Sequence, residues 1–277
     1  MRNKLLICND FPQNTGMIGC LLLTATLLLH GCGAETYEQR LKETAKYFTY
    51  QDARNQALSS IWSSPAVSLR VPIEFEQINA PLVAPVATSE DSEAEVPEAT
   101  PTVDPRQPDY ADLVLPGLEG AWRMEVPVDL DNEIVDRPAY LYVLSNYSLL
   151  KEKNMDDALD FFNAVNNQIA SAFNQFINNE DFKIERYPEG KGYIEPKSFN
   201  VGEFKPEMPI DGVPYQFQIF QVESGNNQLV ILLVAPENIT GRSQINEHMK
   251  YSLETVEFVS PQSGSGRSDS AARSSKF

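Results

Sequence analysis

The sequence predicts an α+β domain in which an antiparallel β-sheet lies between helices, preceded by an N-terminal helix and interrupted by a disordered acidic segment. Three observations carry this prediction. Residues 67–75 alternate apolar and polar side chains, which is the period of a half-buried strand. Residues 155–176 repeat apolar side chains at helical spacing. Residues 229–234 are apolar throughout, as expected of a central strand covered on both faces.

The first 31 residues have the composition of a bacterial export signal. Arg2 and Lys4 supply positive charge before an apolar run at 17–29. The run is shorter than the roughly 20 residues that a membrane-spanning helix needs, so a signal peptide is favoured over a transmembrane anchor. The other alternative is a buried N-terminal helix with an incidental cysteine, which the abrupt change to polar sequence disfavours.

A short motif ends this run: Leu29, His30, Gly31 and Cys32. It resembles the lipobox of bacterial lipoprotein signal peptides. The resemblance implies cleavage between Gly31 and Cys32, a diacylglyceryl group on the Cys32 sulfur, and acylation of the new amino terminus. Several acyl chains anchor a protein stably where one holds it only marginally. Gly33 stands where an aspartate retains enterobacterial lipoproteins in the inner membrane, so the resemblance implies an outer-membrane protein facing the periplasm.

The charge balance narrows the expected partners. Cleavage before Cys32 removes Arg2, Lys4 and Asp10 and leaves 20 basic and 38 acidic side chains. Nucleic-acid binding needs a basic face, so the composition excludes that class. An acidic chain gains nothing from anionic lipid headgroups, and the acyl group is therefore the expected membrane attachment.

The cysteine and histidine content narrows the expected chemistry. Cys8, Cys20 and His30 leave with the signal peptide, so Cys32 and His248 are the remaining cysteine and histidine. This excludes zinc sites built on several of these side chains and makes a Ser-His-Asp triad depend on one residue. We expect His248 on or beside the solvent face of a short helix at 243–252, and no cofactor.

Residues 32–62 are expected to carry the lipid and to form a helical stalk, with the helix itself at 35–62. Four apolar side chains recur there at helical spacing: Tyr37, Leu41, Ala45 and Phe48. This stripe requires a partner, which is either the globular domain or another copy of the chain. A coiled coil is the weaker choice because polar residues follow Phe48 on the same face.

Two segments are predicted to be disordered. Residues 79–109 contain six prolines and seven acidic residues against one arginine, without periodicity, and cannot offset their ordering entropy by burial. The serine- and glycine-rich tail at 260–277 is expected to be flexible for the same reason. The globular domain is therefore assigned to residues 63–78 and 110–259.

Within this domain the expected elements follow in the order β, β, β, α, β, β, β, α, β. The strands are predicted at 67–75, 121–128, 139–144, 182–187, 215–222, 229–234 and 255–259, and the helices at 155–176 and 243–252. An acidic turn at 129–137 is expected to join the second and third strands. Asn154 is the expected N-cap of the long helix. The apolar face of that helix is predicted to consist of Leu159, Phe162, Val165, Ile169, Phe173 and Phe176.

This order of elements, with a short helix leading into a final strand at 252–258, resembles the PsbP-like fold of the extrinsic PsbP subunits of photosystem II and the Mog proteins. Together with the lipobox, the chain resembles lipoproteins of planctomycete-type bacteria. The resemblance implies an α/β/α sandwich that acts as a non-catalytic binding or assembly module. It provides no residue with a known contact.

Two groups of residues are weak candidate sites. The acidic turn offers calcium a possible oxygen cluster in Asp129, Asp131 and Glu133, but it lacks the glycine and the spacing of a calcium loop, which favours a solvated hairpin. A second group alternates on two predicted strands and is a binding face or, more commonly, sheet packing: Tyr140, Tyr142, Tyr215 and Phe217.

The sequence therefore favours a lipid-anchored, non-catalytic binding or scaffold module of the bacterial cell envelope, with an envelope protein as its partner. The alternative is an envelope hydrolase that uses pairs of Asp and Glu residues. An enzyme is expected to show a deep pocket with convergent carboxylates, and a binding module an open face.

Overall fold

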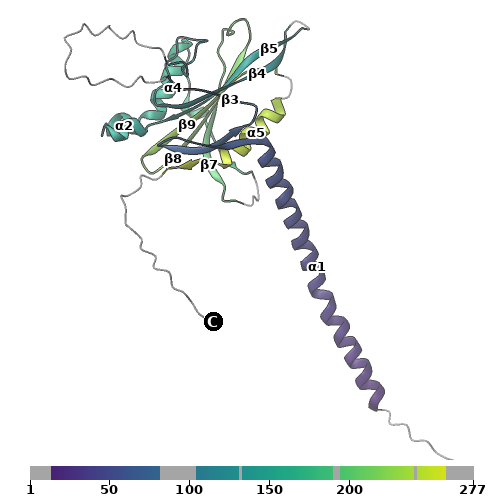
Figure 1. The fold of residues 1–277 in the computed structure, drawn as a ribbon. Coiled ribbons are helices and arrows are strands. Elements are labelled where there is room, and N and C mark those ends of the chain that lie inside the picture. The colour runs from purple at the N-terminus through teal and green to yellow at the C-terminus, as the bar shows by residue number, and fades with distance from the viewer. Residues whose placement is uncertain (1–13, 82–103, 131–132, 190–193, 240–241, 260–277) are drawn as a thin grey trace, which may run out of the picture. The chain divides into compact units, whose positions relative to one another are not determined.

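The computed structural model of the chain describes residues 14–81, 104–130, 133–189, 194–239 and 242–259, apart from the side chains of residues 14–34 and 243 (Figure 1). The expectations for residues 1–13, 82–103 and 260–277 lie outside the described residues. The chain forms two compact units, residues 1–53 and 54–277.

The first unit consists of helix α1, Asn14–Ala57, whose last turn belongs to the second unit. The predicted helix at 35–62 is thus too long, because strand β1 occupies Leu58–Ser63. The Arg70 guanidinium donates to the carbonyl oxygens of Leu58 and Ser59 at 2.9 and 2.8 Å, which satisfies groups that a continuing helix would use. Residues 58–63 are therefore part of the globular domain rather than of the stalk.

The predicted apolar stripe of α1 is exposed at Tyr37, Leu41 and Phe48. The rings of Tyr47 and Phe48 lie 5.7 Å apart on the same helix. That the stripe has a partner stays a prediction.

A seven-stranded antiparallel sheet forms the centre of the second unit, in the order β3-β4-β5-β9-β8-β7-β6. The strands are β3 Glu76–Ile78, β4 Leu118–Leu130, β5 Glu133–Ser145, β6 Lys183–Tyr187, β7 Lys197–Phe204, β8 Tyr215–Ser224 and β9 Asn227–Pro236. The apolar strand at 229–234 lies in β9, the fourth of the seven, which confirms its predicted central place.

Both faces of this sheet are covered (Figure 1). One face carries helices α2 Tyr147–Lys151, α3 Met155–Leu159 and α4 Phe161–Ala172 together with the segment 104–115. On it, the Phe217 ring lies 5.3 Å from that of Phe173 and 6.4 Å from that of Tyr110. The other face carries α5 Arg242–Glu254 and a small sheet of β1, β2 Val67–Pro72 and β10 Glu257–Phe258. The α+β class with an antiparallel sheet between helices is therefore confirmed.

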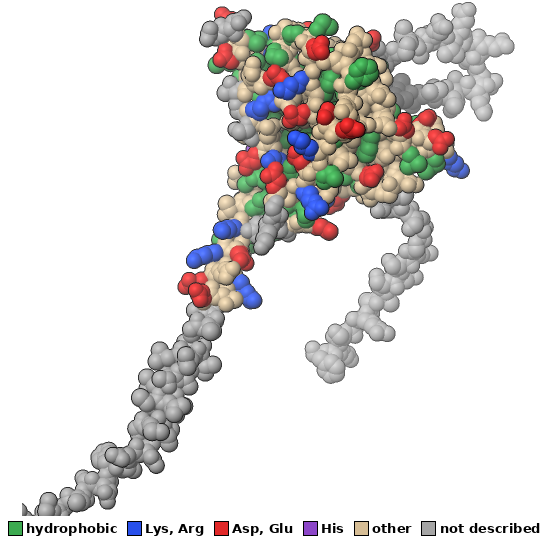
Figure 2. All heavy atoms as spheres, turned by 180° about the vertical axis from the view of Figure 1, so that it is seen from behind, with side chains coloured by type: hydrophobic (Ala, Val, Ile, Leu, Met, Phe, Trp, Pro, Cys, Tyr) green, Lys and Arg blue, Asp and Glu red, His purple; other side chains and the backbone are tan. Residues whose placement is uncertain are grey.

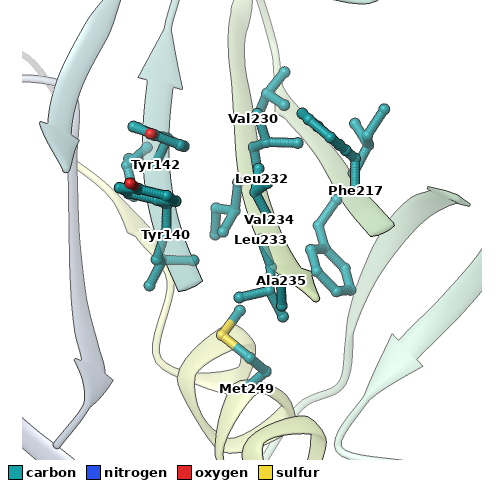
Figure 3. Packing of buried hydrophobic residues seen from close by; sticks show 14 of the residues in the cluster. Tyr140, Tyr142, Phe217, Val230, Leu232, Leu233, Val234, Ala235 and Met249 are labelled. Carbon is teal, nitrogen blue, oxygen red and sulfur yellow. The ribbon is translucent and has the colours of Figure 1, made fainter. Parts of the chain in front are cut away.

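Buried side chains pack around β9, and one of them comes from α5 (Figure 3). Tyr140 and Tyr142 stack with centroids 6.0 Å apart on one face, while Met249 of α5 lies below Ala235 on the other. The small sheet packs on the same face as α5 through an edge-to-face contact of Trp62 and Trp122, whose centroids are 4.9 Å apart.

The prediction of a single long helix at 155–176 is wrong. The structure divides it at Asp160 into α3 and α4 and ends it at Ala172. The cause is the Gln228 side chain of β9, which donates to the Leu159 carbonyl at 3.1 Å and accepts from the Phe162 N–H at 3.3 Å. These backbone groups lie on either side of the break, so a tertiary amide satisfies both helix ends.

The ends of this helical region also differ from the prediction. Asn154 stands at the N-cap of α3, but its side chain donates to Asp157 at 2.5 Å and makes no capping bond to the backbone. Phe176 lies beyond α4 and is 98 % exposed, whereas Phe161, which was not on the predicted face, is 0 % exposed.

The expected disorder of residues 79–109 is wrong for residues 104–109. Arg106 pairs with Asp104 at 2.7 Å and donates to the Glu119 carbonyl at 3.1 Å. The Gln107 side chain bonds both backbone groups of Leu115. These contacts and the burial of Leu113 and Leu115 offset the entropy cost of ordering the segment. The composition of the segment did not reveal them.

Several predicted strand boundaries change, and strands β1, β3 and β7 were not predicted. The expected acidic turn at 129–137 is largely strand, because β4 and β5 stay paired out to Leu130 and Glu133. The hairpin itself is as predicted. The strands predicted at 67–75 and 255–259 are shorter, and end at Pro72 and Phe258.

Candidate functional site

A groove beside α4 is a candidate site on the described surface. We call it the amide groove, and its volume is about 420 Å³. It is lined by Leu159, Phe162, Asn163, Asn179, Phe182, Ile184, Asn200 and Gln221. None of these side chains is ionisable, so the groove combines apolar surface with neutral amides.

The floor of the amide groove follows from strand register. Ile184 of β6 pairs with Asn200 of β7, and Asn200 pairs with Gln221 of β8. Directly paired residues project from the same face of a sheet, so the three side chains form one row across three strands. Ile184 is 73 % exposed at the outer end of this row, and Gln221 is 6 % exposed at the inner end.

Helical residues form the walls. Phe162 and Asn163 come from the first turn of α4, and Asn179 begins the 3₁₀-helix Asn179–Asp181. The Phe182 ring lies over Gly202 of β7, where an added Cβ would come within 2.5 Å of the ring. Glycine at this position therefore allows an aromatic ring to approach the strand backbone closely beside the groove.

A chain of side-chain amides runs along the groove from the sheet to the surface. Gln221 donates to Asn166 at 3.2 Å, Asn166 donates to Asn179 at 2.8 Å, and Asn179 donates to Asn163 at 2.9 Å. Asn163 in turn donates to the Asp160 carboxylate at 2.6 Å. The chain joins β8, α4 and the 3₁₀-helix, and it holds the groove walls together.

The carboxylate sets the direction of every bond in this chain. An ionised carboxylate only accepts, so Asn163 must present its NH₂ group to Asp160 and its oxygen to Asn179. The orientation of each following amide is fixed in the same way. Asn166 donates to Asn179 and accepts through its oxygen from the NH₂ group of Gln221. The Gln221 Oε1 is then left as an acceptor that no described residue engages.

A second cavity, of about 400 Å³, lies beside the small sheet and contains charged residues. Its cations already have protein partners: Arg70 donates to Asn55 at 2.8 Å as well as to backbone carbonyls, and Lys197 donates to the Glu254 carbonyl at 2.7 Å. Burial lowers the pKa of Lys197 and, with the charge of Arg54, that of Arg70. The charged residues that line this cavity therefore have a structural role.

The predicted calcium group is not assembled. Asp131 lies outside the described residues. Asp129 pairs across the hairpin with Ile134, the neighbour of Glu133, so Asp129 and Glu133 project from opposite faces. Among the described residues, no three His, Cys, Asp or Glu side chains form a group that could hold a metal ion.

The residues of the predicted aromatic face lie together in the structure, but other parts of the chain cover them. Tyr140, Tyr142, Tyr215 and Phe217 are all buried on one sheet face. The Tyr110 ring lies 4.9 Å from that of Tyr140, and Tyr140 donates to Asp109 at 3.3 Å. Burial raises the pKa of Tyr215 to about 12 and raises those of the other three tyrosines as well. These residues are sheet packing, the commoner of the two expected roles.

The remaining predicted residues lie elsewhere. The side chains of Gly31 and Cys32 are outside the described residues. His248 lies on α5 and is partly buried, and its Nδ1 lies 2.7 Å from Glu74 Oε1. None of the helices in the described part of the chain is both long and apolar enough to cross a membrane.

The comparisons with known proteins do not identify a family. No protein-family model matches the chain, and no curated protein matches it. A solved structure from Bacteroides thetaiotaomicron VPI-5482 is similar at 9 % identity and a TM-score of 0.31, over 70 % of this chain and 46 % of that one. The chain thus spans less than half the length of that protein, and a likeness of this size supports no inference about function.

The amide groove was not predicted from the sequence. Its polar residues come from four separate elements, and only Leu159 and Phe162 belonged to a predicted apolar face. The local excess of asparagine at 163–179 was the available signal, but asparagine is also common in turns and at helix ends.

Proposed function

We propose that this chain is a lipid-anchored, non-catalytic binding module of the bacterial cell envelope. Its anchor is the acylated Cys32, and its binding element is the amide groove. The open groove carries the proposal, because its lining offers fixed hydrogen-bonding groups and apolar surface but no acid, base or nucleophile suited to proton transfer.

The distribution of charge agrees with this function. Acidic and basic side chains are interspersed over the face of the second unit seen in Figure 2. Neither sign forms a continuous field there that would draw a polyanion to this face. The acyl group then supplies the membrane attachment, and an envelope protein or another envelope component is the partner.

The proposal includes the assignment of the second unit to a PsbP-like fold. The PsbP-like arrangement is supported by helices on both faces of an antiparallel sheet and by α5 leading directly into β10. A fold of this kind supports a binding or assembly role only by analogy, since function resides in the site.

The anchor is tested by metabolic labelling of the full chain with an alkyne fatty acid in a bacterium that processes lipoproteins. We expect label on the wild type and on Cys20→Ser, whose cysteine lies inside the apolar run. We expect Cys32→Ser to carry no label and to accumulate as uncleaved precursor. Label on Cys32→Ser at the wild-type level would contradict the anchor, and fractionation of the wild type to the inner membrane alone would contradict the outer-membrane location.

A further inference from the structure

The side-chain oxygen of Gln221, Oε1, is the starting point, because it accepts no hydrogen bond from the described residues and is not one of their fully enclosed unpartnered atoms, so a ligand can reach it. Gln221 is 6 % exposed and lines the groove floor, and its NH₂ group is committed to Asn166. A ligand that covered this oxygen without donating to it would leave it unsatisfied, so a ligand that brings a hydrogen-bond donor is favoured there.

Asn200 supplies the complementary group beside it. Asn200 pairs in register with Gln221, lines the same floor and is exposed, and within the described residues its side chain makes no hydrogen bond. Its amide can both donate and accept. The floor therefore presents one fixed acceptor and one adjustable amide on neighbouring strands.

The walls of the groove favour a ligand with an apolar face. The rings of Phe162 and Phe182 and the exposed side chains of Leu159 and Ile184 border the two amides. A charged ligand would lose water without gaining an opposite charge, because the lining has none. A purely apolar ligand would leave Gln221 unsatisfied.

From these features we infer that the amide groove binds a neutral saccharide. Ring hydroxyls, or the acetamido group of an amino sugar, donate to Gln221 and bond Asn200, while the C–H face of the sugar packs on the phenylalanine rings. The groove volume of about 420 Å³ is within the range of about 300–1,000 Å³ found for small-ligand sites. The inference rests on the proposed binding role of this groove and names its ligand class.

The test is calorimetric titration of the full-length chain, purified in a mild detergent, with cellotriose, chitotriose, trigalacturonate and a hexapeptide of glycine and serine. We expect saturable binding of a neutral trisaccharide, and cellotriose against chitotriose separates hydroxyl from acetamido recognition. Asn200→Ala is expected to raise the Kd on the order of tenfold, because it removes hydrogen bonds to the ligand. Asn167→Ala, on the exposed side of α4, is the matched control and should leave the Kd unchanged.

The outcomes separate the ligand class from the binding function. Binding of the peptide or of trigalacturonate that Asn200→Ala weakens, without binding of either neutral sugar, overturns the saccharide assignment and leaves a binding groove. Failure of all four probes overturns the saccharide assignment as well. Sugar binding that survives Asn200→Ala and Asn200→Asp unchanged, in variants that melt like the wild type, places the saccharide outside this groove.

Discussion

The side-chain amide of Gln107 pairs with both backbone groups of Leu115. Gln107 Oε1 accepts from the Leu115 N–H at 2.8 Å, and Nε2 donates to the Leu115 carbonyl at 3.1 Å. The amide thus takes the place of a neighbouring strand. Leu115 is 1 % exposed, so its backbone groups require a protein partner. This contact holds the segment that covers the tyrosines of β5 and β8.

Gln107→Ala is expected to lower the free energy of unfolding by about 1–3 kcal/mol, because it leaves two backbone groups of Leu115 unsatisfied. Urea unfolding followed by circular dichroism measures the change. Gln168→Ala, an exposed glutamine of α4, is the matched control and should stay within about 0.5 kcal/mol of the wild type. Equal stability of both variants would show that the 104–115 segment does not depend on this pair.

Gly117 and Gly225 form a matched pair, since both have φ of +61°. A Cβ at Gly117 would lie 2.0 Å from the Ser145 carbonyl oxygen, whereas a Cβ at Gly225 meets nothing within 4 Å. Gly225→Ala is therefore expected to cost about 1–2 kcal/mol from backbone strain alone. Gly117→Ala adds a clash with backbone and should fail to fold or melt far lower. Thermal melts of the two variants that coincide would contradict this difference.

Phe161 and Phe176 test which side of the helical region faces the sheet. Phe161→Ala is expected to cost about 3–5 kcal/mol, as truncation of a fully buried phenylalanine does. Phe176→Ala should change stability by less than about 0.5 kcal/mol, because that ring is 98 % exposed. Denaturant unfolding of both variants measures the costs, and the reverse order of costs would show that Phe176, and not Phe161, packs against the sheet.

The buried tyrosines predict a loss of stability in alkali. Burial raises the pKa of Tyr215 to about 12, and raises that of Tyr140 too, whereas an unfolded tyrosine ionises near pH 10. This stabilisation is complete below about pH 10 and is lost as the pH rises through 12, because the unfolded chain releases protons that the folded chain retains.

Tyrosinate absorbance and circular dichroism, recorded together against pH, measure this effect. We expect tyrosinate absorbance to rise steeply where the secondary structure is lost. Tyr215→Phe should weaken the pH dependence, whereas Tyr37→Phe, on an exposed position of α1, should not change it. Early titration of all tyrosines in the folded chain would contradict the prediction.

The elements that depend on local periodicity could be predicted. The all-apolar run at 229–234 became the central strand β9, because only a central strand has both faces covered. The helix at 243–252 lies within α5, and the alternation from Val67 marks β2. In each case, the spacing of the apolar residues along the chain predicts which of them become buried.

The groove and the helix break could not be predicted in this way. Asn163, Asn179 and Gln221 lie on three separate elements, and their bonds exist only after α4 has packed on the sheet. Gln228 divides the helix although it is separated from Phe162 by 66 residues. Polar side chains have no periodicity that marks their partners.

The sequence by itself determined the class of the domain, the place of its central strand and the motif at Cys32. The tertiary structure decided where the helix breaks, that residues 104–109 are ordered, and which amides meet in the groove. The physical reason is that burial of apolar side chains follows local spacing, whereas each hydrogen bond of Gln107, Gln221 and Gln228 depends on a partner brought close by the whole fold.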